Sequence, residues 1–357
     1  MIILGIETSC DDTGISVVKA IPTKVGVKFD ILSNIISSQI KIHIPFGGVV
    51  PNLAAREHLK NIEPCLKAAL KEANATLKET RLPTRQVDLV AVTIGPGLIP
   101  SLLIGVNFAK ALAYKYKIPI IGVNHIEGHI IAAISEALFP AIALTVSGGH
   151  TQLVLVKGIG KYKIIGETLD DAAGECFDKV AKLLNLGYPG GPIISKEAAK
   201  AGISKLQLPR PMIQHKNYNF SFSGLKTAVL YLTQKLEIKN VGRATSHMIP
   251  TSHMIPEICY ETQQAIIDVL VDKTLRAAKE YKAKTIILSG GVAANKELRK
   301  QMAETIKTRI SNAKFLIPDF KLCTDNGAMI AMAGYYNKNK ATKKYDKIKA
   351  DANLRIS

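Results

Sequence analysis

The sequence predicts an α/β protein, and three observations support this fold class. Short runs of apolar residues alternate with longer amphipathic segments along the 357 residues, as strands alternate with helices in such proteins. Glycine-rich turns separate these segments. Both halves of the chain show a strand meander followed by helices and further strands. We therefore expect two similar lobes, although no residue-by-residue repeat accompanies them.

The first half is expected to begin with strands and to continue with helices. Each strand is a short run rich in Ile and Val, and each helix has apolar residues at helical spacing. The expected strands are Met1–Ile6, Gly14–Lys19, Val27–Ser37, Leu89–Ile94 and Pro119–Val123. The expected helices are about Leu53–Ala73, about Ser101–Tyr116 and the segment that begins at His125.

One stretch of the first half is long enough to cross a bilayer. The 21 residues from Leu89 to Ala109 carry no charge. However, Gly95-Pro96-Gly97 and Pro100 interrupt this stretch, and a buried strand, a tight turn and a helix explain that pattern better. We therefore expect no membrane span.

The second half repeats the order of strands and helices. Its expected strands are Ala141–Val146, Gln152–Val156, Tyr162–Glu167 and Thr285–Leu288. Helices are expected near Glu257–Tyr281, from about Ala293, and from the segment 323–329 onwards. This order indicates an α/β lobe of the same kind as the first.

A hexapeptide stands twice in tandem, at 245–250 and again at 251–256. Its prolines and the absence of a sustained period indicate a loop insertion at about 240–256. His247 and His253 are more simply explained as loop residues than as metal ligands.

Composition favours a cytoplasmic protein with a basic surface. The formal net charge of +18 favours nucleic acid or another polyanion as a partner, although a biased genome also produces such a lysine-rich chain. The lysines between 338 and 349 suit either a phosphate-contacting tail or a solvated, frayed end. The five cysteines form no C-x-x-C pair, and the first residues lack a basic, cleavable leader. Free thiols in the cytoplasm are therefore expected.

Two histidines in the segment His125-Ile126-Glu127-Gly128-His129 have the spacing of metal ligands. Four positions along a helix bring both imidazoles onto one face, where they can hold one transition-metal ion. Glu127 lies about 200° around the helix from that face, so it is poorly placed as the base of a metalloprotease. Asp325, before the last helix, would alone be most simply an N-cap. Beside the histidine pair it becomes the candidate third ligand.

Glycine-rich turns are the second candidate site. They stand at Ser147-Gly148-Gly149, at Pro189-Gly190-Gly191-Pro192 and at Ser289-Gly290-Gly291. Glycine lets the backbone approach a ligand closely, and amides at a helix start favour phosphate, so these turns suggest a bound nucleotide. Neither a phosphate-binding loop of the G-x-x-x-x-G-K-[ST] type nor a dinucleotide fingerprint is present.

An acidic cluster lies between the first two of these turns. Asp171, Glu175 and Asp178 share one helix face by their spacing. Acids in a first helical turn are often only partners of the helix dipole, which suits Asp171. Asp178 lies beyond that turn and is the better candidate for contacting a ligand hydroxyl.

The combination of these motifs, in this order, resembles the TsaD/Kae/Qri family of tRNA N6-adenosine threonylcarbamoyltransferases, once labelled O-sialoglycoprotein endopeptidases. The resemblance runs from about Ile2 to Gly334, and its Ser-Gly-Gly-His-Thr-Gln form looks bacterial or organellar. The motifs that carry it are Glu7–Gly14, His125–His129, Ser147–Gln152, Asp171–Lys179, Pro189–Pro192, Asn219–Lys226, Ser289–Val292 and Thr324–Ala328.

The resemblance implies an actin-like ATPase (ASKHA) fold of two ribonuclease-H-like lobes with a nucleotide and metal cleft between them. The first lobe would comprise 1–138 with about 325–340, the second 139–324, and a lysine-rich tail 341–357. The implied reaction moves the threonylcarbamoyl group of threonylcarbamoyl-AMP to N6 of adenosine 37, in tRNAs that read codons beginning with A. It forms t6A and releases AMP.

Site residues carried over by the resemblance fall into three sets. The metal ligands, which act in catalysis through one Fe²⁺ or Zn²⁺ ion, would be His125, His129 and Asp325. The residues implied to bind the adenine nucleotide are Thr145, Val146, Ser147, Gly148, Gly149, Asp178, Gly191 and Asn295. Further phosphate contacts are expected from Ser9, Asp11, Gly290 and Gly291. Expected partners are tRNA, a TsaB-type paralogue and a TsaE-type ATPase.

Two other functions compete with this interpretation. A metal-dependent endopeptidase would require a water-activating base on the metal face, which Glu127 does not supply. A non-catalytic nucleotide-binding scaffold would use the glycine turns without the histidine pair. The sequence also departs from the family pattern at Thr145, where bacterial members usually carry an aliphatic residue and archaeal members a metal-contacting tyrosine. A fourth protein ligand is therefore not expected there.

Overall fold

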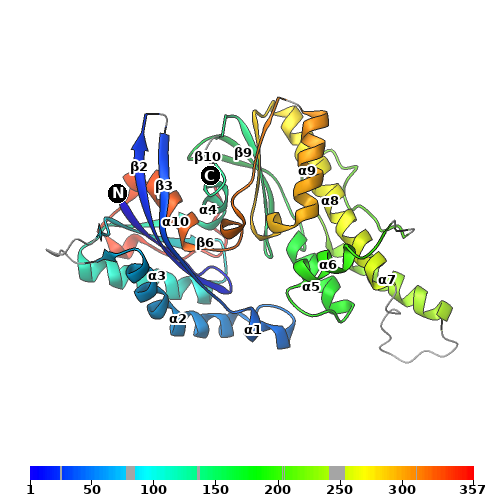
Figure 1. Cartoon of the computed structure of the whole chain (residues 1–357), viewed down its shortest axis with the longest axis horizontal. Coiled ribbons are helices and arrows are strands. Elements are labelled where there is room, and N and C mark those ends of the chain that lie inside the picture. Colours follow the sequence, from blue (N-terminus) through cyan, green and yellow to red (C-terminus); the bar gives the residue numbers. More distant parts are fainter. Residues whose placement is uncertain are drawn as a thin grey trace. The chain divides into compact units, whose positions relative to one another are not determined.

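The computed structural model describes residues 1–24, 26–77, 85–134, 137–202, 204, 206–240, 254–310 and 312–357. The chain forms two compact units (Figure 1). Unit 1 comprises Met1–Glu136, Ile159–Tyr162 and Pro318–Ser357, and unit 2 comprises Ala137–Gly158 and Lys163–Ile317. Each unit contains a five-stranded sheet with helices, so the predicted α/β class is confirmed.

The sheet of unit 1 has the strand order β3-β2-β1-β6-β7. Its first three strands form the antiparallel meander that the sequence predicts, and β6 and β7 continue the sheet in parallel with β1. The strands are β1 (Ile2–Glu7), β2 (Asp12–Thr23), β3 (Gly26–Ser38), β6 (Leu89–Gly95) and β7 (Ile120–Asn124). A short parallel pair, β4 (Ala75–Thr76) and β5 (Arg85–Gln86), lies apart from it.

Helices cover both faces of this sheet, which is why every residue of β1 is buried. Ile2, Leu4 and Ile6 belong to a core cluster with side chains of two helices, α2 (Pro51–Glu72) and α3 (Ile99–Tyr116). On the opposite face a last helix, α10 (Gly327–Tyr336), contacts β1. A Cβ at Gly5 would lie 2.0 Å from the carbonyl oxygen of Gly327, so only glycine permits this contact. The remaining helices of unit 1 are α1 (Ile40–His43) and α4 (His125–Ile131).

Unit 2 repeats this topology. Its sheet has the order β10-β9-β8-β11-β12, with β9 antiparallel to β8, and with β8, β11 and β12 parallel to one another. The strands are β8 (Ala141–Val146), β9 (Thr151–Gly158), β10 (Lys161–Glu167), β11 (Thr285–Ser289) and β12 (Lys314–Leu316). The same order of strands in both sheets agrees with the architectural duplication expected from the sequence.

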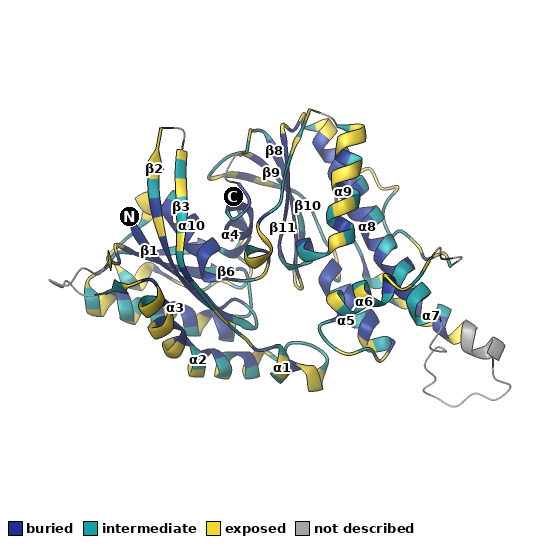
Figure 2. Ribbon diagram, viewed as in Figure 1, coloured by how far each residue is buried: buried dark blue, intermediate teal, exposed yellow. Residues whose placement is uncertain are grey.

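The helices of unit 2 are α5 (Ala173–Leu183), α6 (Gly190–Ala198), α7 (Ser223–Asn240), α8 (Ile255–Glu280) and α9 (Lys296–Arg309). Most of α8 is buried, whereas α9 exposes its outer face (Figure 2). Residues 245–253 of the tandem hexapeptide lie outside the described residues, so the predicted loop insertion stays a prediction.

Two expected helix starts are wrong. The helix expected from about Ala293 begins at Lys296, because Asn295 caps it by accepting a hydrogen bond from the amide of Leu298. A short 3-10 turn, Gly291–Ala294, takes the place of its first turn. Asp171 precedes α5 rather than lying in its first turn, and it accepts a hydrogen bond from Lys179 at 2.5 Å.

The lysine-rich end of the chain folds onto unit 1. Thr342 forms an antiparallel bridge with Ile120, at the start of β7, and Ile348 is buried in the core cluster of this unit. The alternative of a frayed end is therefore wrong for this segment. Among the described residues, no helix has both the length and the apolar character that a membrane span requires.

Candidate metal centre and nucleotide-binding turns

Helix α4 holds both histidines because Asn124 fixes its first turn. The side chain of Asn124 accepts hydrogen bonds from the amides of Ile126 and Glu127, which satisfies two of the free amides at the helix start. His125 and His129 are both buried, and their ring centroids lie 4.7 Å apart. The predicted common face of the two imidazoles is confirmed.

Asp325 completes the cluster from a distant part of the sequence. Its Oδ1 atom lies 3.1 Å from Nε2 of His129 and 3.7 Å from Nε2 of His125. The N-cap of α10 is Asn326, which accepts a hydrogen bond from the amide of Met329, so the N-cap alternative for Asp325 is wrong. One ligand atom from each of the three residues lies within 4.8 Å of the others.

The donor set and its surroundings fit a cation. Two imidazole nitrogens and one carboxylate oxygen suit transition metals such as iron and zinc. Negative charge also gathers nearby. Burial of Asp12 and the neighbouring charges of Asp11 and Asp325 together raise the pKa of Asp12 to about 7. Among the described residues, Oδ1 of Asp12 is buried without a hydrogen-bond partner. A positive ion at the cluster would relieve this repulsion.

Glu7 orients His125 toward the cluster. Glu7 is fully buried at the end of β1, and its Oε2 atom lies 3.1 Å from Nδ1 of His125. The carboxylate also accepts hydrogen bonds from the amide of Ser9 and the hydroxyl of Thr93. A carboxylate on the second nitrogen of a metal-binding imidazole fixes its tautomer and ring orientation.

The protonation of His125 reflects these neighbours. Burial by itself lowers the pKa of His125, but the negative charges of Asp325 and Glu7 and the hydrogen bond with Glu7 raise it to about 9. In the metal-free protein this histidine is therefore protonated at neutral pH, and a metal ion must displace that proton.

Glu127 faces away from the cluster, as its position on the helix predicts. One carboxylate oxygen accepts a hydrogen bond from the Tyr162 hydroxyl at 3.1 Å, and the other accepts one from the Asn337 amide at 3.0 Å. Burial raises the pKa of Glu127. This residue therefore ties α4 to Asn337, just after α10, and to Tyr162 of the same unit, rather than activating a water molecule at the metal.

Replacing Glu127 with alanine is expected to lower stability rather than to remove the metal. The substitution leaves the Tyr162 hydroxyl without its acceptor and removes one of the two acceptors of the Asn337 side-chain amide. An unsatisfied buried group costs about 1–3 kcal/mol. Urea denaturation measures this change, with Glu63→Ala as the control, because Glu63 is solvent-exposed on α2, where it pairs with the exposed Lys67. Loss of metal binding without a loss of stability would contradict this assignment.

The candidate nucleotide residues of unit 2 begin at the ends of two neighbouring parallel strands. Thr145 on β8 pairs with Ser289 on β11, and their hydroxyls are hydrogen-bonded at 3.0 Å. Val146 follows Thr145, and Ser147 closes the next turn by bonding His150 through both its amide and its hydroxyl. The turns that follow β8 and β11 therefore lie side by side at one edge of the sheet.

The glycines of these turns are of two kinds. At Gly174, Gly190 and Gly290 an added Cβ would lie 2.4–2.5 Å from a backbone carbonyl oxygen, so packing alone requires glycine there. At other positions an added Cβ would meet no atom within 4 Å. These open positions include Gly148, Gly149, Gly191 and Gly291. The open glycines leave room for a ligand to approach the backbone.

Other predicted site residues already have partners within the protein. Asp178 accepts a hydrogen bond from the amide of Gly190 at 2.6 Å, which joins α5 to the start of α6. The side-chain amide of Asn295 donates to Gln263 while its oxygen caps α9. Ser9, in unit 1, is buried with its hydroxyl 3.1 Å from Nδ1 of His125. These three residues are thus held in place by the fold.

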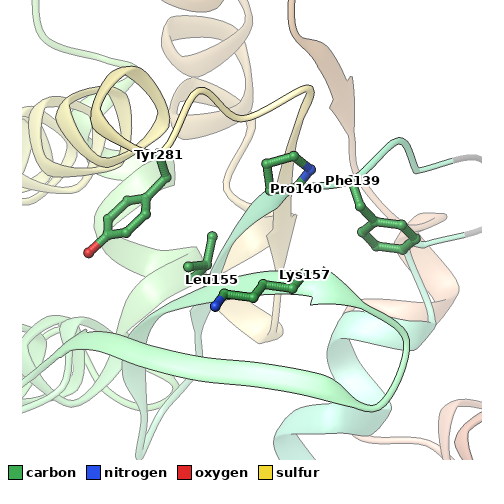
Figure 3. Close-up of a pocket in the computed structure, with 5 residues that line it drawn as sticks. All are labelled: Phe139, Pro140, Leu155, Lys157 and Tyr281. Carbon is green, nitrogen blue, oxygen red and sulfur yellow. The ribbon is translucent and has the colours of Figure 1, made fainter.

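A surface pocket of unit 2 contains none of the predicted site residues (Figure 3). Its lining residues are Phe139, Pro140, Leu155, Lys157 and Tyr281. None of these lining residues belongs to a glycine turn, so the pocket is not assigned to the reaction.

Comparison with known proteins identifies the family. A family model described as "TsaD: tRNA N6-adenosine threonylcarbamoyltransferase" matches residues 30–332. A relative of that name from Thermosipho africanus is 46% identical over 359 residues, which covers 100% of both chains. The chain belongs to the tRNA N6-adenosine threonylcarbamoyltransferase family. Relatives of the same name from Persephonella marina (48% identical; 94% of this chain and 90% of the relative) and Bacillus subtilis (46%; 94% and 90%) agree.

Membership of this family makes the chain an acyltransferase that forms t6A, and neither the endopeptidase nor the scaffold alternative is favoured. Solved structures confirm the actin-like ATPase fold. HypF from T. kodakarensis aligns with a TM-score of 0.57 at 14% identity, over 96% of this chain and 48% of that chain. Component A of the (R)-2-hydroxyglutaryl-CoA dehydratase of Acidaminococcus fermentans aligns with a TM-score of 0.53 at 13% identity, over 95% and 99%.

Proposed function

We propose that this acyltransferase moves the threonylcarbamoyl group of threonylcarbamoyl-AMP to N6 of adenosine 37, in tRNAs that read codons beginning with A. A bond forms between N6 and the carbonyl carbon, the bond from that carbon to the phosphate oxygen breaks, N6 loses a proton, and AMP leaves. The observation that carries the proposal is the buried cluster of His125, His129 and Asp325 in a chain of this family.

These three residues would hold one Fe²⁺ or Zn²⁺ ion, which when bound supplies Lewis-acid polarisation of a carbonyl oxygen. The chain itself orients the ligands. Glu7 accepts a hydrogen bond from Nδ1 of His125, and Nε2 of the same ring lies 3.7 Å from Oδ1 of Asp325. Asn124 caps the start of α4, and Glu127 holds α4 against Asn337. Both imidazoles therefore keep their positions relative to Asp325. Both histidines are almost fully buried, which limits the exposure of their rings to solvent.

Unit 2 would bind the adenylate through backbone groups. A phosphate or a ribose could approach the backbone at Gly148, Gly149, Gly191 and Gly291, because no atom lies within 4 Å of an added Cβ at these glycines. Asp178 and Asn295 are held near the same turns and would contact hydroxyl groups or the base. Thr145, Val146 and Ser147 would line this site, and Gly290 would contribute a further phosphate contact. On unit 1, Ser9 and Asp11 are the candidates for contacting a phosphate.

The proposal includes partners and location. A TsaB-type paralogue and a TsaE-type ATPase would assist the chain, and the reaction would take place in the cytoplasm, where tRNA is modified. The five described cysteines are all free thiols, which suits a reducing compartment.

The proposed activity is tested by incubating the protein and its bacterial partners with threonylcarbamoyl-AMP and unmodified tRNA. Mass spectrometry of the nucleosides should show N6-threonylcarbamoyladenosine, and AMP should appear in equal amount. A tRNA in which guanosine replaces the target adenosine is the control. Release of AMP without a modified nucleoside would contradict the proposed transfer.

Replacing Gly191 with alanine is expected to weaken adenylate binding while leaving the fold intact. The new methyl group meets no protein atom but occupies the space proposed for the ligand. Overpacking of about 1–3 kcal/mol corresponds to roughly a tenfold to hundredfold increase in KM for the adenylate. Thermal unfolding and steady-state kinetics measure the two effects separately.

Two matched substitutions make this test specific. Gly224 is also the second residue of its helix and also has open space beside it, so Gly224→Ala should change neither stability nor KM. Gly190→Ala should instead destabilise the protein, because its Cβ would lie 2.4 Å from the carbonyl oxygen of Phe177. An unchanged adenylate KM in Gly191→Ala would exclude the proposed contact.

A further inference from the structure

The lysine-rich segment from 338 to 349 forms an exposed basic surface on unit 1. All six of its lysines are exposed, and none forms an ion pair with an acid of the described chain. These lysines are Lys338, Lys340, Lys343, Lys344, Lys347 and Lys349. The segment contains one acidic residue, Asp346. Its positive charge is therefore largely uncompensated from within the protein.

The segment is held in a defined conformation by its apolar and backbone groups. Thr342 and Ile120 exchange two backbone hydrogen bonds of 2.9 Å. Ile348 is buried in the core of unit 1, and the ring of Tyr345 packs edge-on against Tyr114 of α3 at 5.8 Å. The lysines are thus presented by an ordered backbone, which distinguishes them from the charges of a solvated tail.

Helix α3 extends the basic surface and adds an aromatic ring. Lys115 and Lys117 at its end are exposed, and Tyr114 is 73% exposed although it packs against Tyr345. Lysines at the end of a helix also favour its dipole, which alone would explain Lys115. Exposed aromatic rings among lysines suit a ligand that carries both phosphates and stackable bases.

The same segment continues to the helix that holds the two histidines. The amide of Asp351 donates to Ile94 at the end of β6. The side chain of Asn124, which caps α4, donates to the carbonyl oxygen of Leu354 at 3.2 Å, and Figure 1 marks the C-terminus beside α4. One continuous stretch of chain therefore links the lysines to the N-cap of the metal-binding helix.

We propose that Lys115, Lys117 and the lysines of 338–349 bind the phosphodiester backbone of the substrate tRNA. This inference rests on the proposed function, because it assigns a surface to the substrate of that reaction. Ammonium groups on an ordered surface neutralise successive phosphates and release their counterions. A membrane surface suits the segment less well, since its large aliphatic residue, Ile348, is buried rather than presented to lipid.

The test compares two variants that each lose four exposed lysines. The first replaces Lys343, Lys344, Lys347 and Lys349 with alanine. The control replaces Lys279, Lys284, Lys300 and Lys307 of unit 2, which are also exposed, and therefore carries the same net charge. Fluorescence anisotropy measures the binding of labelled, unmodified tRNA to the full chain over a range of salt concentrations, and nucleoside analysis measures modification with the partners present.

The first variant should bind tRNA at least roughly tenfold more weakly near 0.1 M salt. The slope of its log binding constant against log salt concentration should be shallower by up to about three. Its KM for tRNA should rise while kcat stays unchanged, and replacing the same four lysines with arginine should preserve binding. The control should behave as the unsubstituted protein.

Equal losses in both variants would reduce the effect to net charge and overturn the assignment. Unchanged tRNA binding by the first variant would also overturn the assignment. This holds even if that variant loses binding to vesicles containing phosphatidylserine or to an acidic protein partner. Failure of the proposed function is distinguishable, because the unsubstituted protein would then bind tRNA without producing the modified nucleoside.

Discussion

Replacing His129 with alanine is expected to abolish metal binding and to reduce threonylcarbamoyl transfer by roughly a hundredfold to ten-thousandfold, because Lewis-acid stabilisation amounts to several kcal/mol. His129 lies 3.1 Å from Asp325 and is buried on the shared face of α4. The remaining His125 and Asp325 offer too few ligands for a stable site. Asp325→Ala should have a similar effect on transfer, with less effect on folding, because its side chain is 20% exposed.

A buried histidine outside the cluster provides the control for His129→Ala. His43 is also fully buried, and it bonds Gln39 and the amide of Val50. His43→Ala should therefore lose stability without losing the metal. Metal content is measured by mass spectrometry of the purified proteins, and transfer is measured under saturating tRNA and adenylate. Full transfer activity in a metal-free His129→Ala protein would exclude a catalytic role for the cluster.

The cluster was only partly predictable from local sequence. The spacing of His125 and His129 places both imidazoles on one face of a helix. Both residues are helical because Asn124, the N-cap, precedes His125 directly. Asp325 is 196 residues from His129 in the chain, so its position depends on the packing of α10 against the first sheet. The local sequence made Asp325 a candidate third ligand, and the family resemblance implied that it has this role.

The glycine turns show a different limit of sequence reasoning. Gly190 and Gly191 are neighbours with the same residue type, yet packing against Phe177 requires the first, while open space surrounds the second. A single sequence records that both are glycine and contains no sign of this difference. The strands, by contrast, follow from their short apolar runs, because a strand covered on both faces buries every residue, as β1 does.

Glu7 is the residue of the metal centre that sequence reasoning missed. Its signal in the sequence is an acid at the end of an otherwise apolar strand. Such an acid usually begins a loop and faces solvent, but Glu7 is fully buried between Ser9, Thr93 and His125. The amide of Ser9, in the turn after β1, donates back to this carboxylate, and with Thr93 and His125 it offsets the cost of burying the charge.

Replacing Glu7 with glutamine is expected to weaken metal binding by about tenfold to a hundredfold, as is usual when the carboxylate behind a metal-binding imidazole is lost. Glutamine keeps the volume of Glu7 but places an amide donor against the donors from Ser9, Thr93 or His125. A competing chelator with Zn²⁺ measures the affinity below the unfolding temperature, so any loss of stability does not enter the result.

The pH dependence distinguishes orientation of His125 from a purely structural effect. In the metal-free protein the pKa of His125 is raised from its ordinary value of 6.5 to about 9. Protonation of His125 therefore stabilises the fold fully below pH 6.5, and this stabilisation is lost as the pH rises through about 9. Protons compete with the metal over the same range, and affinity should increase until that pH is reached. Loss of Glu7 lowers this pKa, so the variant should reach its maximal affinity at a lower pH. The deficit of the variant should consequently be largest near pH 9 and smaller at pH 7, whereas an equal deficit at both values would show that Glu7 only supports the fold.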